Sequence, residues 1–284
     1  MPASDDPSDL PERRTLPGGG SWAEFDAALE EVDRSGVGRL HAALMAASIG
    51  PYQIDREKAG RIASAVPGYS KCLARQYRFR DQAVRAAISG GRFRQFVEYR
   101  PPLPMSPEPV TVYDLIQDCC AEPTRTVLVP RERILETHLI LRYPNATDMA
   151  IHRATIEDPV TPLASAEDGD RLRAESEPIF ATMISDLHHR DGDLTPLIRL
   201  FRDALRPGSE IAFTHLAPAT EPRHAKALAD LAEQYWDTTE PILIPRERET
   251  IERWFQDGDW DLAVSLSTAP DGTLPVWCII ASRT

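Results

Sequence analysis

His188 and His215 are the two residues of this chain best suited to acid–base chemistry. His188 follows the apolar run 179–185 (IFATMIS), and His215 lies near the end of a second run, 210–216 (EIAFTHL). An imidazole titrates near neutral pH, and open α/β sheets bind ligands at the carboxyl ends of their parallel strands. Either histidine can therefore serve as a general base. The alternative for each is an imidazole that only hydrogen-bonds a loop and shapes the cleft.

The segment around His188 contains three further groups that bind metals in other proteins, His189, Asp191 and Asp193. Zinc sites use recurrent spacings of histidine, cysteine and carboxylate ligands. The spacing here matches none of them, so the sequence predicts no metal site.

Arg100, Arg131 and Arg133 follow two short strands predicted at 95–99 (QFVEY) and 126–129 (TVLV). Guanidinium groups bind carboxylates and phosphates, so these arginines can line a pocket for an anion. The alternative is a set of solvent-exposed arginines with no ligand.

The loop after the first of these strands contains no glycine. It runs from Arg100 to Pro104 (RPPLP) and precedes a helix predicted at 113–120. In nucleotide-type α/β sheets this loop normally carries glycines that cradle a cofactor. Proline fixes φ near about −65° and has no N–H group, so this loop lacks the ordinary backbone cradle.

Short β-branched and aromatic runs alternate with helical periodicity over the rest of the chain. Further strands are predicted at 148–153, 179–185, 210–216, 260–267 and 276–282. Helices are predicted at 131–143, 193–205, 222–236 and 245–255. Four tryptophans are predicted to pack between helix and sheet, Trp236, Trp254, Trp260 and Trp277. The fold class is therefore α/β: a three-layer sandwich with a mainly parallel, Rossmann-like sheet and a C-terminal antiparallel hairpin.

The chain divides into three regions. Residues 1–20 are rich in Pro, Asp, Ser and Gly and are predicted to form a disordered tail. Residues 21–90 form a helical N-terminal cap, and residues 91–284 form the Rossmann-like domain. Within the cap, helices are predicted from Ser21, where Glu24 completes a capping box, and at 38–47, 56–66 and 69–89. The basic residues of the last helix are interpreted as a solvated face.

The composition argues against several classes of function. The formal net charge of −12 disfavours a nucleic-acid surface. No apolar run approaches the roughly 20 residues that span a bilayer, and no basic-then-apolar leader begins the chain. Four scattered cysteines (Cys72, Cys119, Cys120 and Cys278) are predicted to be reduced thiols. We therefore expect a cytoplasmic protein that binds neither nucleic acid nor membrane.

Three segments carry a resemblance to a known family: 183–218 (MISDLHHRDGDLTPLIRLFRDALRPGSEIAFTHLAP), 152–163 (HRATIEDPVTPL) and 54–67 (IDREKAGRIASAVP). Their order and spacing resemble the S-adenosylmethionine-dependent methyltransferases of domain of unknown function 574, a family typical of actinobacteria. The resemblance runs from about Ser35 to the C-terminus. It implies the class I methyltransferase fold, S-adenosylmethionine as cofactor and a small-molecule nucleophile as substrate.

The resemblance also implies the positions of the cofactor site: Glu98, Arg100, Pro102, Arg131, Thr155, Asp186 and Leu187. Several of these depart from the family's pattern. Arg100 and Pro102 stand in the family's glycine loop, and Arg131 stands where an acid accepts the ribose hydroxyls. Glu98 keeps an acid near the family's aspartate, and its alternative role is a salt bridge to Arg100 or Arg131.

We therefore expect a divergent member of the family whose cofactor binding is weakened or lost, acting on an unknown small molecule in specialised metabolism. Two alternatives stay open. One is a non-catalytic pseudoenzyme that acts as a partner or regulatory subunit, with a second copy of the chain among its candidate partners. The other is a methyltransferase fold that runs a cofactor-free cyclisation or elimination with His188 as base.

Overall fold

A computed structural model describes residues 33–46, 52–104, 111–164, 172–174, 176–268 and 273–284. The predicted disordered tail and the capping box at Ser21 lie outside these residues. Within them, seven strands form one sheet in the order β3-β2-β1-β4-β5-β7-β6. The strands are β1 (Gln95–Tyr99), β2 (Arg125–Val129), β3 (Met149–Ile151), β4 (Ile179–Met183), β5 (Glu210–Leu216), β6 (Trp260–Ser267) and β7 (Val276–Arg283).

The first five strands are parallel, and β7 joins β5 in antiparallel register. β6 and β7 pair as an antiparallel hairpin, with Trp260 opposite Arg283 and Ser267 opposite Val276. The order reverses between β1 and β4, the switch point at which open α/β sheets bind ligands. The predicted fold class is confirmed.

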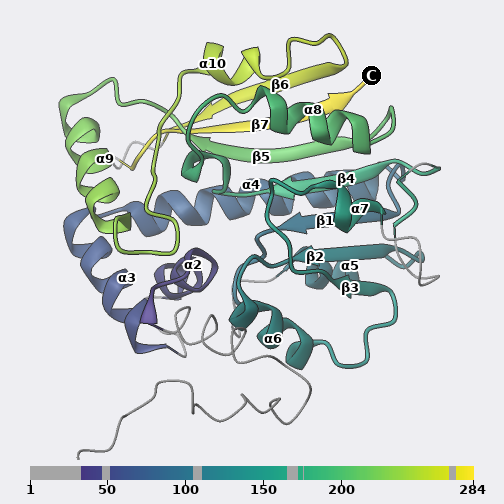
Figure 1. The fold of residues 1–284 in the computed structure, drawn as a ribbon, viewed down its shortest axis with the longest axis horizontal. Helices are drawn as coiled ribbons and strands as arrows, with labels where there is room; N and C mark the ends of the chain where they lie inside the picture. Colours follow the sequence, from purple (N-terminus) through teal and green to yellow (C-terminus); the bar gives the residue numbers. More distant parts are fainter. Residues whose placement is uncertain (1–32, 47–51, 105–110, 165–171, 175, 269–272) are drawn as a thin grey trace, which may run out of the picture.

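The helices surround this sheet (Figure 1). They are α2 (Val37–Met45), α3 (Gln53–Ala65), α4 (Tyr69–Ser89), α5 (Val112–Cys119), α6 (Arg133–Arg142), α7 (Val160–Ala164), α8 (Thr195–Ala204), α9 (Pro222–Tyr235) and α10 (Arg248–Arg253). A short 3-10 turn, η1 (Leu187–His189), follows β4.

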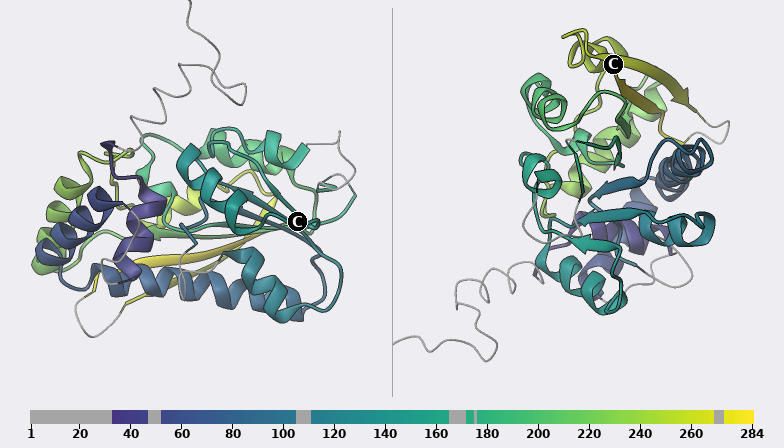
Figure 2. Two further views of the ribbon diagram at one scale, coloured as in Figure 1. Left: turned by 90° about the horizontal axis from the view of Figure 1, so that it is seen from below. Right: turned by 90° about the vertical axis from the view of Figure 1, so that its right-hand side faces the viewer.

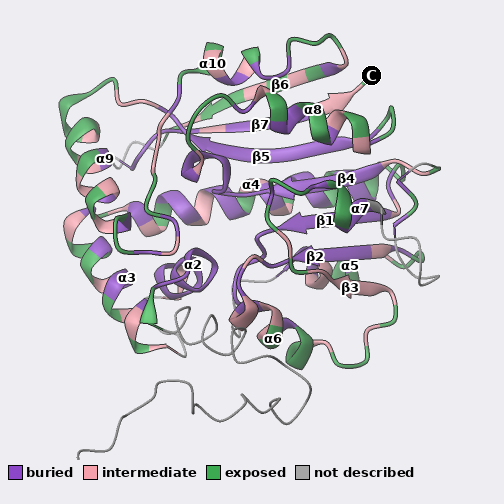
Figure 3. Cartoon of the chain, viewed as in Figure 1, coloured by how far each residue is buried: buried purple, intermediate pink, exposed green. Residues whose placement is uncertain are grey.

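The alternation of side chains along each strand explains the two packed layers. In β1, Val97 and Tyr99 join the cluster that packs against α7, α8 and α10, whereas Phe96 joins the cluster of α4 and α5 on the other face. The ring of Tyr99 meets that of Phe201 edge-on at 5.4 Å between centroids. Two views at right angles show α4 on the opposite side of the sheet from α7 and α8 (Figure 2). Burial on both faces, visible along β1, β4 and β5 in Figure 3, is what parallel strands require.

A third cluster lies beyond the carboxyl ends of the parallel strands. There α2 and α3 pack together and against α9 (Figure 1). Its buried side chains come from these helices, from the first half of α4 and from residues at the ends of strands, among them Leu216 of β5 and Ile184, which follows β4. The predicted cap helices therefore cover the edge of the sheet at which a ligand would bind.

Several predictions of local structure are wrong. α7 lies where the sequence analysis predicted neither a helix nor a strand, and the last predicted helix begins at Arg248 rather than 245. Trp236 is 78% exposed rather than core, whereas Trp254 and Trp260 are buried as predicted. On α4 the basic residues do not form one solvated face, because Arg80 is 1% exposed.

α5 begins at a capping box that the sequence analysis missed. Thr111 Oγ1 accepts a hydrogen bond from Asp114 N, and Asp114 Oδ2 accepts from Thr111 N at 3.1 Å. Both bonds satisfy N–H groups that the first turn of a helix leaves unpaired.

We expect Thr111→Ala to lower the free energy of unfolding by about 1 kcal/mol, because the cap's acceptor is lost while its side chain is fully buried. Urea denaturation measures the change. The control is Thr137→Ala, an exposed threonine within α6 whose hydroxyl only bonds Arg133 O, for which a change within about 0.5 kcal/mol is expected. Equal effects of the two substitutions would contradict the capping role.

Candidate functional site

The residues that follow β1, β2 and β4 converge at the carboxyl edge of the sheet. They are Arg100, Arg131 and Asp186, all three of them positions that the resemblance assigned to the cofactor site. Because neighbouring parallel strands end side by side, residues far apart in sequence become neighbours here. The structure brings these three together as predicted.

Arg100 is the central side chain of this group. It is 6% exposed, and its backbone has φ +54°, in the left-handed region that favours glycine. Its guanidinium lies 2.5 Å from Asp186 Oδ1 and donates to the carbonyl oxygen of Ser185 at 3.3 Å and to the carboxylate of Glu240. Burial lowers the pKa of Arg100, but Asp186 and Glu240 more than offset this, so the pKa is raised and the group stays charged.

Glu240 lies on the segment between α9 and α10 and is 4% exposed. Its carboxylate accepts from both Arg100 and Arg131, and it lies 3.9 Å from Arg190. Arg190 also lies 3.5 Å from Asp186 and pairs with Glu157. Three arginines and three carboxylates thus form one network, which we call the arginine network: Arg100, Arg131, Arg190, Glu157, Asp186 and Glu240. The sequence analysis missed Glu240, Arg190 and Glu157, since no local pattern marks them.

The arginine network fills the space between the ends of β1 and β2. The cavity that remains has a volume of about 10 Å³, barely the room of one water molecule. Thr155, another of the cofactor positions that the resemblance implies, borders this remaining cavity from an exposed loop, whereas Leu187 is fully buried and belongs to the core. Pro102 is also buried, in a loop that offers no N–H at this residue.

The residues present do not fit the cofactor that the resemblance implies. S-adenosylmethionine carries a sulfonium cation, and the guanidinium of Arg100 lies where that ligand would need both space and a negative environment. The half-exposed Arg131 cannot accept a hydrogen bond from a ribose hydroxyl.

Glu98 lies apart from the arginine network. Its carboxylate accepts from Arg80 Nη1 at 2.6 Å and from the N–H of Val112 at 2.8 Å. The predicted salt bridge to Arg100 or Arg131 is therefore wrong: Glu98 points to the face of the sheet that α4 covers. Burial raises the pKa of Glu98, while Arg80 and the Val112 N–H oppose this shift.

Substitution of Arg80 tests how far its ion pair with Glu98 contributes to stability. We expect Arg80→Met to lower the free energy of unfolding by about 3–5 kcal/mol, because it leaves a carboxylate buried without its cation. The double variant Arg80→Met/Glu98→Leu should recover most of this loss. Arg85→Met, at an exposed residue of the same helix, is the control. Urea denaturation measures all three, and a double variant no more stable than Arg80→Met would contradict the pairing.

The two candidate bases are fully buried. His188 Nε2 lies 3.1 Å from Ser185 Oγ, and the carbonyl oxygen of His188 accepts from Ile244 N at 2.7 Å. His215 Nδ1 donates to the carbonyl oxygen of Leu216 at 2.9 Å, and Arg246 donates to its Nε2 at 3.2 Å. Neither ring lines the 10 Å³ cavity, and neither lines a second cavity of about 370 Å³ beside the arginine network. This geometry matches the alternative that they shape the site, and a role as base stays a prediction.

Four buried histidines gather under the cap: His41, His188, His189 and His215. Tyr235 contacts two of them, since its hydroxyl lies 3.2 Å from His41 Nε2 and its ring 4.9 Å from that of His189. Burial lowers the pKa of all four histidines, to about 3 for His215. Nearby cations lower it further: Arg100 does so for His41, His188 and His189, and Arg246 for His215. His189 also lowers the pKa of His41 and His188. All four are therefore neutral at pH 7.

These shifts make stability depend on pH. The unfolded chain protonates each histidine near pH 6.5 and the folded chain does not, so stability is present above this pH and is lost as the pH falls. For each such histidine we expect a loss of about 1.4 kcal/mol between pH 7.5 and 5.5. Asp55 and Glu98, whose pKa values burial raises, act in the opposite sense.

The contribution of those carboxylates to the pH dependence is the same in His215→Gln and in the unmodified protein, so it cancels when the two are compared. Urea denaturation at the two pH values should show a loss smaller by about 1.4 kcal/mol in the variant. An unchanged difference between the two pH values would contradict a neutral, buried His215.

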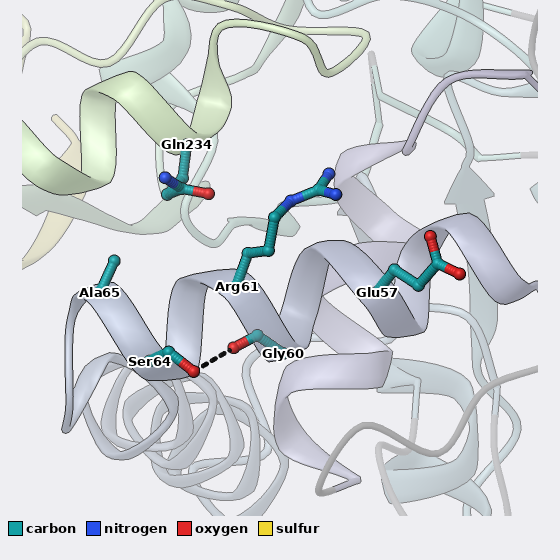
Figure 4. A pocket seen from close by; sticks show the side chains of 6 residues that line it. All are labelled: Glu57, Gly60, Arg61, Ser64, Ala65 and Gln234. Atoms are coloured by element: carbon teal, nitrogen blue, oxygen red, sulfur yellow. Dashed lines mark hydrogen bonds between the residues drawn. The ribbon is translucent and has the colours of Figure 1, made fainter.

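Beside the arginine network lies a cavity of about 370 Å³. It is lined by Arg131, Glu157, His189, Arg190, Asp191, Leu194, Leu197, Thr239, Glu240, Pro241 and Ile242. A larger hollow of about 850 Å³ lies between α3 and α9 (Figure 4). Gly60, Ser64 and Gln234 border that hollow, and none of the candidate catalytic or cofactor residues lines it.

Within the described residues, no group of three or more His, Cys, Asp or Glu side chains could hold a metal ion. Among the helices of the described part of the chain, none is both long and apolar enough to cross a bilayer.

Comparisons with known proteins agree with the fold. A family model described as S-adenosyl methyltransferase matches residues 32–263. A candidate methyltransferase from Thermobifida fusca superimposes with a TM-score of 0.72 at 20% identity, covering 88% of this chain and 96% of its own. A DUF574 family protein from Streptomyces avermitilis gives 0.74 at 18% identity, covering 89% and 99%. No curated protein matches the chain.

Proposed function

The chain belongs to the S-adenosyl methyltransferase family, and on this premise we propose that it has kept the family's fold but not its way of binding S-adenosylmethionine. In this proposal the protein binds a small molecule at the carboxyl edge of the sheet without transferring a methyl group from that cofactor. Its setting would be the cytoplasm of an actinobacterium, in specialised metabolism.

One observation carries the proposal: the buried guanidinium of Arg100, paired with Asp186 and Glu240, in a space of which about 10 Å³ remains. A buried ion pair is costly to break, because each freed charge loses its partner in a medium of low dielectric. Arg100 is therefore a poor candidate for a side chain that swings aside to admit a cation.

The alternatives differ in what they need. A cofactor-free reaction with His188 as base needs a substrate in contact with that ring, which bonds Ser185 and lies apart from the 370 Å³ cavity. A partner or regulatory role is favoured by Trp236, an indole 78% exposed at the end of α9, since tryptophan is enriched at the centres of protein interfaces. We keep the partner role as the second candidate.

Calorimetric titration with S-adenosylmethionine and S-adenosylhomocysteine tests the proposal. We expect no heat of binding up to about 1 mM, a limit that corresponds to about −4 kcal/mol. A micromolar dissociation constant would overturn the proposal.

The double variant Arg100→Gly/Glu240→Gln asks whether Arg100 is the closing group. Glycine suits the positive φ at this position, and the glutamine removes one negative charge, which balances the loss of the Arg100 guanidinium. We expect this variant to bind S-adenosylhomocysteine at least tenfold more tightly than the unmodified protein. If the variant and the unmodified protein bound S-adenosylhomocysteine equally weakly, the loss of cofactor binding would be due to Arg131 and the proline loop instead.

A further inference from the structure

The 370 Å³ cavity beside the arginine network falls in the range of small-molecule sites, roughly 300–1,000 Å³. One wall is apolar and comes from two segments. Leu194 and Leu197 lie at the start of α8, and Pro241 and Ile242 lie on the segment after α9. Ile242 is 38% exposed, so a ligand here would bury apolar surface that water now covers.

The apolar wall is already held in place. His189 Nδ1 donates to the carbonyl oxygen of Ile242 at 2.7 Å, and the N–H of Ile244 donates to the carbonyl oxygen of His188 at 2.7 Å. A wall that is fixed before binding costs a ligand little ordering entropy.

Arg131 also lines the cavity, and its side chain is 37% exposed. Among the described residues its guanidinium has one partner, Glu240, which engages Nη1 alone. Nε and Nη2 remain as donors on the planar group that binds carboxylates in pairs of hydrogen bonds. Glu240 itself shows that a carboxylate is accepted here.

The acids of the lining already have donors. Glu157 Oε1 accepts from Arg190, Glu240 accepts from Arg100 and Arg131, and Asp191 Oδ1 accepts from the N–H of Gly192 at 2.7 Å. Of the two arginines in this lining, Arg131 is the more exposed, 37% against 12% for Arg190, so its unused donors are the ones that a ligand reaches more easily.

We propose that this cavity binds a small aromatic carboxylic acid, with its carboxylate on Arg131 and its ring between Ile242 and the two leucines of α8. The inference rests on the proposed function, because it supplies the ligand class of a protein that does not use S-adenosylmethionine here. It assigns Arg131, a departure from the family's pattern, to recognition of an anion.

Three isosteric probes test the ligand class by calorimetric or NMR titration of the full chain: 2-naphthoate, 2-naphthamide and 2-naphthylmethylamine. We expect the acid to bind in the submillimolar range, the neutral amide at least tenfold more weakly, and the cationic amine not at all. An amine that binds as well as the acid, or an acid that does not bind, would overturn the inference.

Two variants locate the site. Arg131→Gln should weaken binding of 2-naphthoate at least tenfold and abolish the preference for the acid over the amide. Arg133→Gln, at a residue outside the lining, should leave the affinity for both probes unchanged. Ile242→Ser should weaken binding of the acid and of the amide by the same factor. Thermal melts of each variant report folding, and Arg131→Lys, which keeps the charge near Glu240, should restore part of the preference. If Arg131→Gln kept the full preference for the acid over the amide, Arg131 would not be the residue that binds the carboxylate.

The two proposals can fail separately. Binding of S-adenosylhomocysteine with displacement of 2-naphthoate would overturn the proposed function while leaving the preference for acids intact. Absence of binding for all of these ligands would overturn only the inference on the acid.

Discussion

A buried positive charge is the constraint on which this site depends. The guanidinium of Arg100 is removed from water, which costs several kcal/mol unless carboxylates and hydrogen bonds surround it. Asp186 and Glu240 meet that need, and Glu240 in turn binds Arg131 and approaches Arg190. The conformation of the segment after α9 is thereby tied to the ends of β1, β2 and β4. A substitution at Arg100 would affect all of these elements together.

The sheet and the site depend on different residues. The parallel strands are stabilised by apolar packing on both faces, through Val97 and Phe96 in β1 for example. The ligand-binding edge is formed instead by residues that follow the strands, together with Glu240 of the segment after α9. The fold can therefore persist when the residues at that edge change.

Much of the fold followed from local patterns. The bounds of β1 and α4 are those predicted, because a short β-branched run and a long helical periodicity are strong local signals. α7 was missed because five residues carry too little periodicity to distinguish a helix from a loop. Trp236 was assigned to the core on its residue type alone, and nothing local reveals which side of a helix end faces solvent.

The sequence by itself determined that the chain forms a mainly parallel α/β sheet, that its first loop lacks glycines, and that Arg100 and Arg131 follow its first two strands; Asp186 was assigned to the same site only by the family resemblance. The first three conclusions need only periodicity and the geometry of neighbouring strands. Only the tertiary structure decided what those residues do there. The partner of Arg100 is Glu240, 140 residues away along the chain, and the partner of Glu98 is Arg80 on the other face of the sheet. Ion pairs of this kind depend on which side chains the packed fold brings within a few ångströms, and no spacing in the sequence encodes that distance.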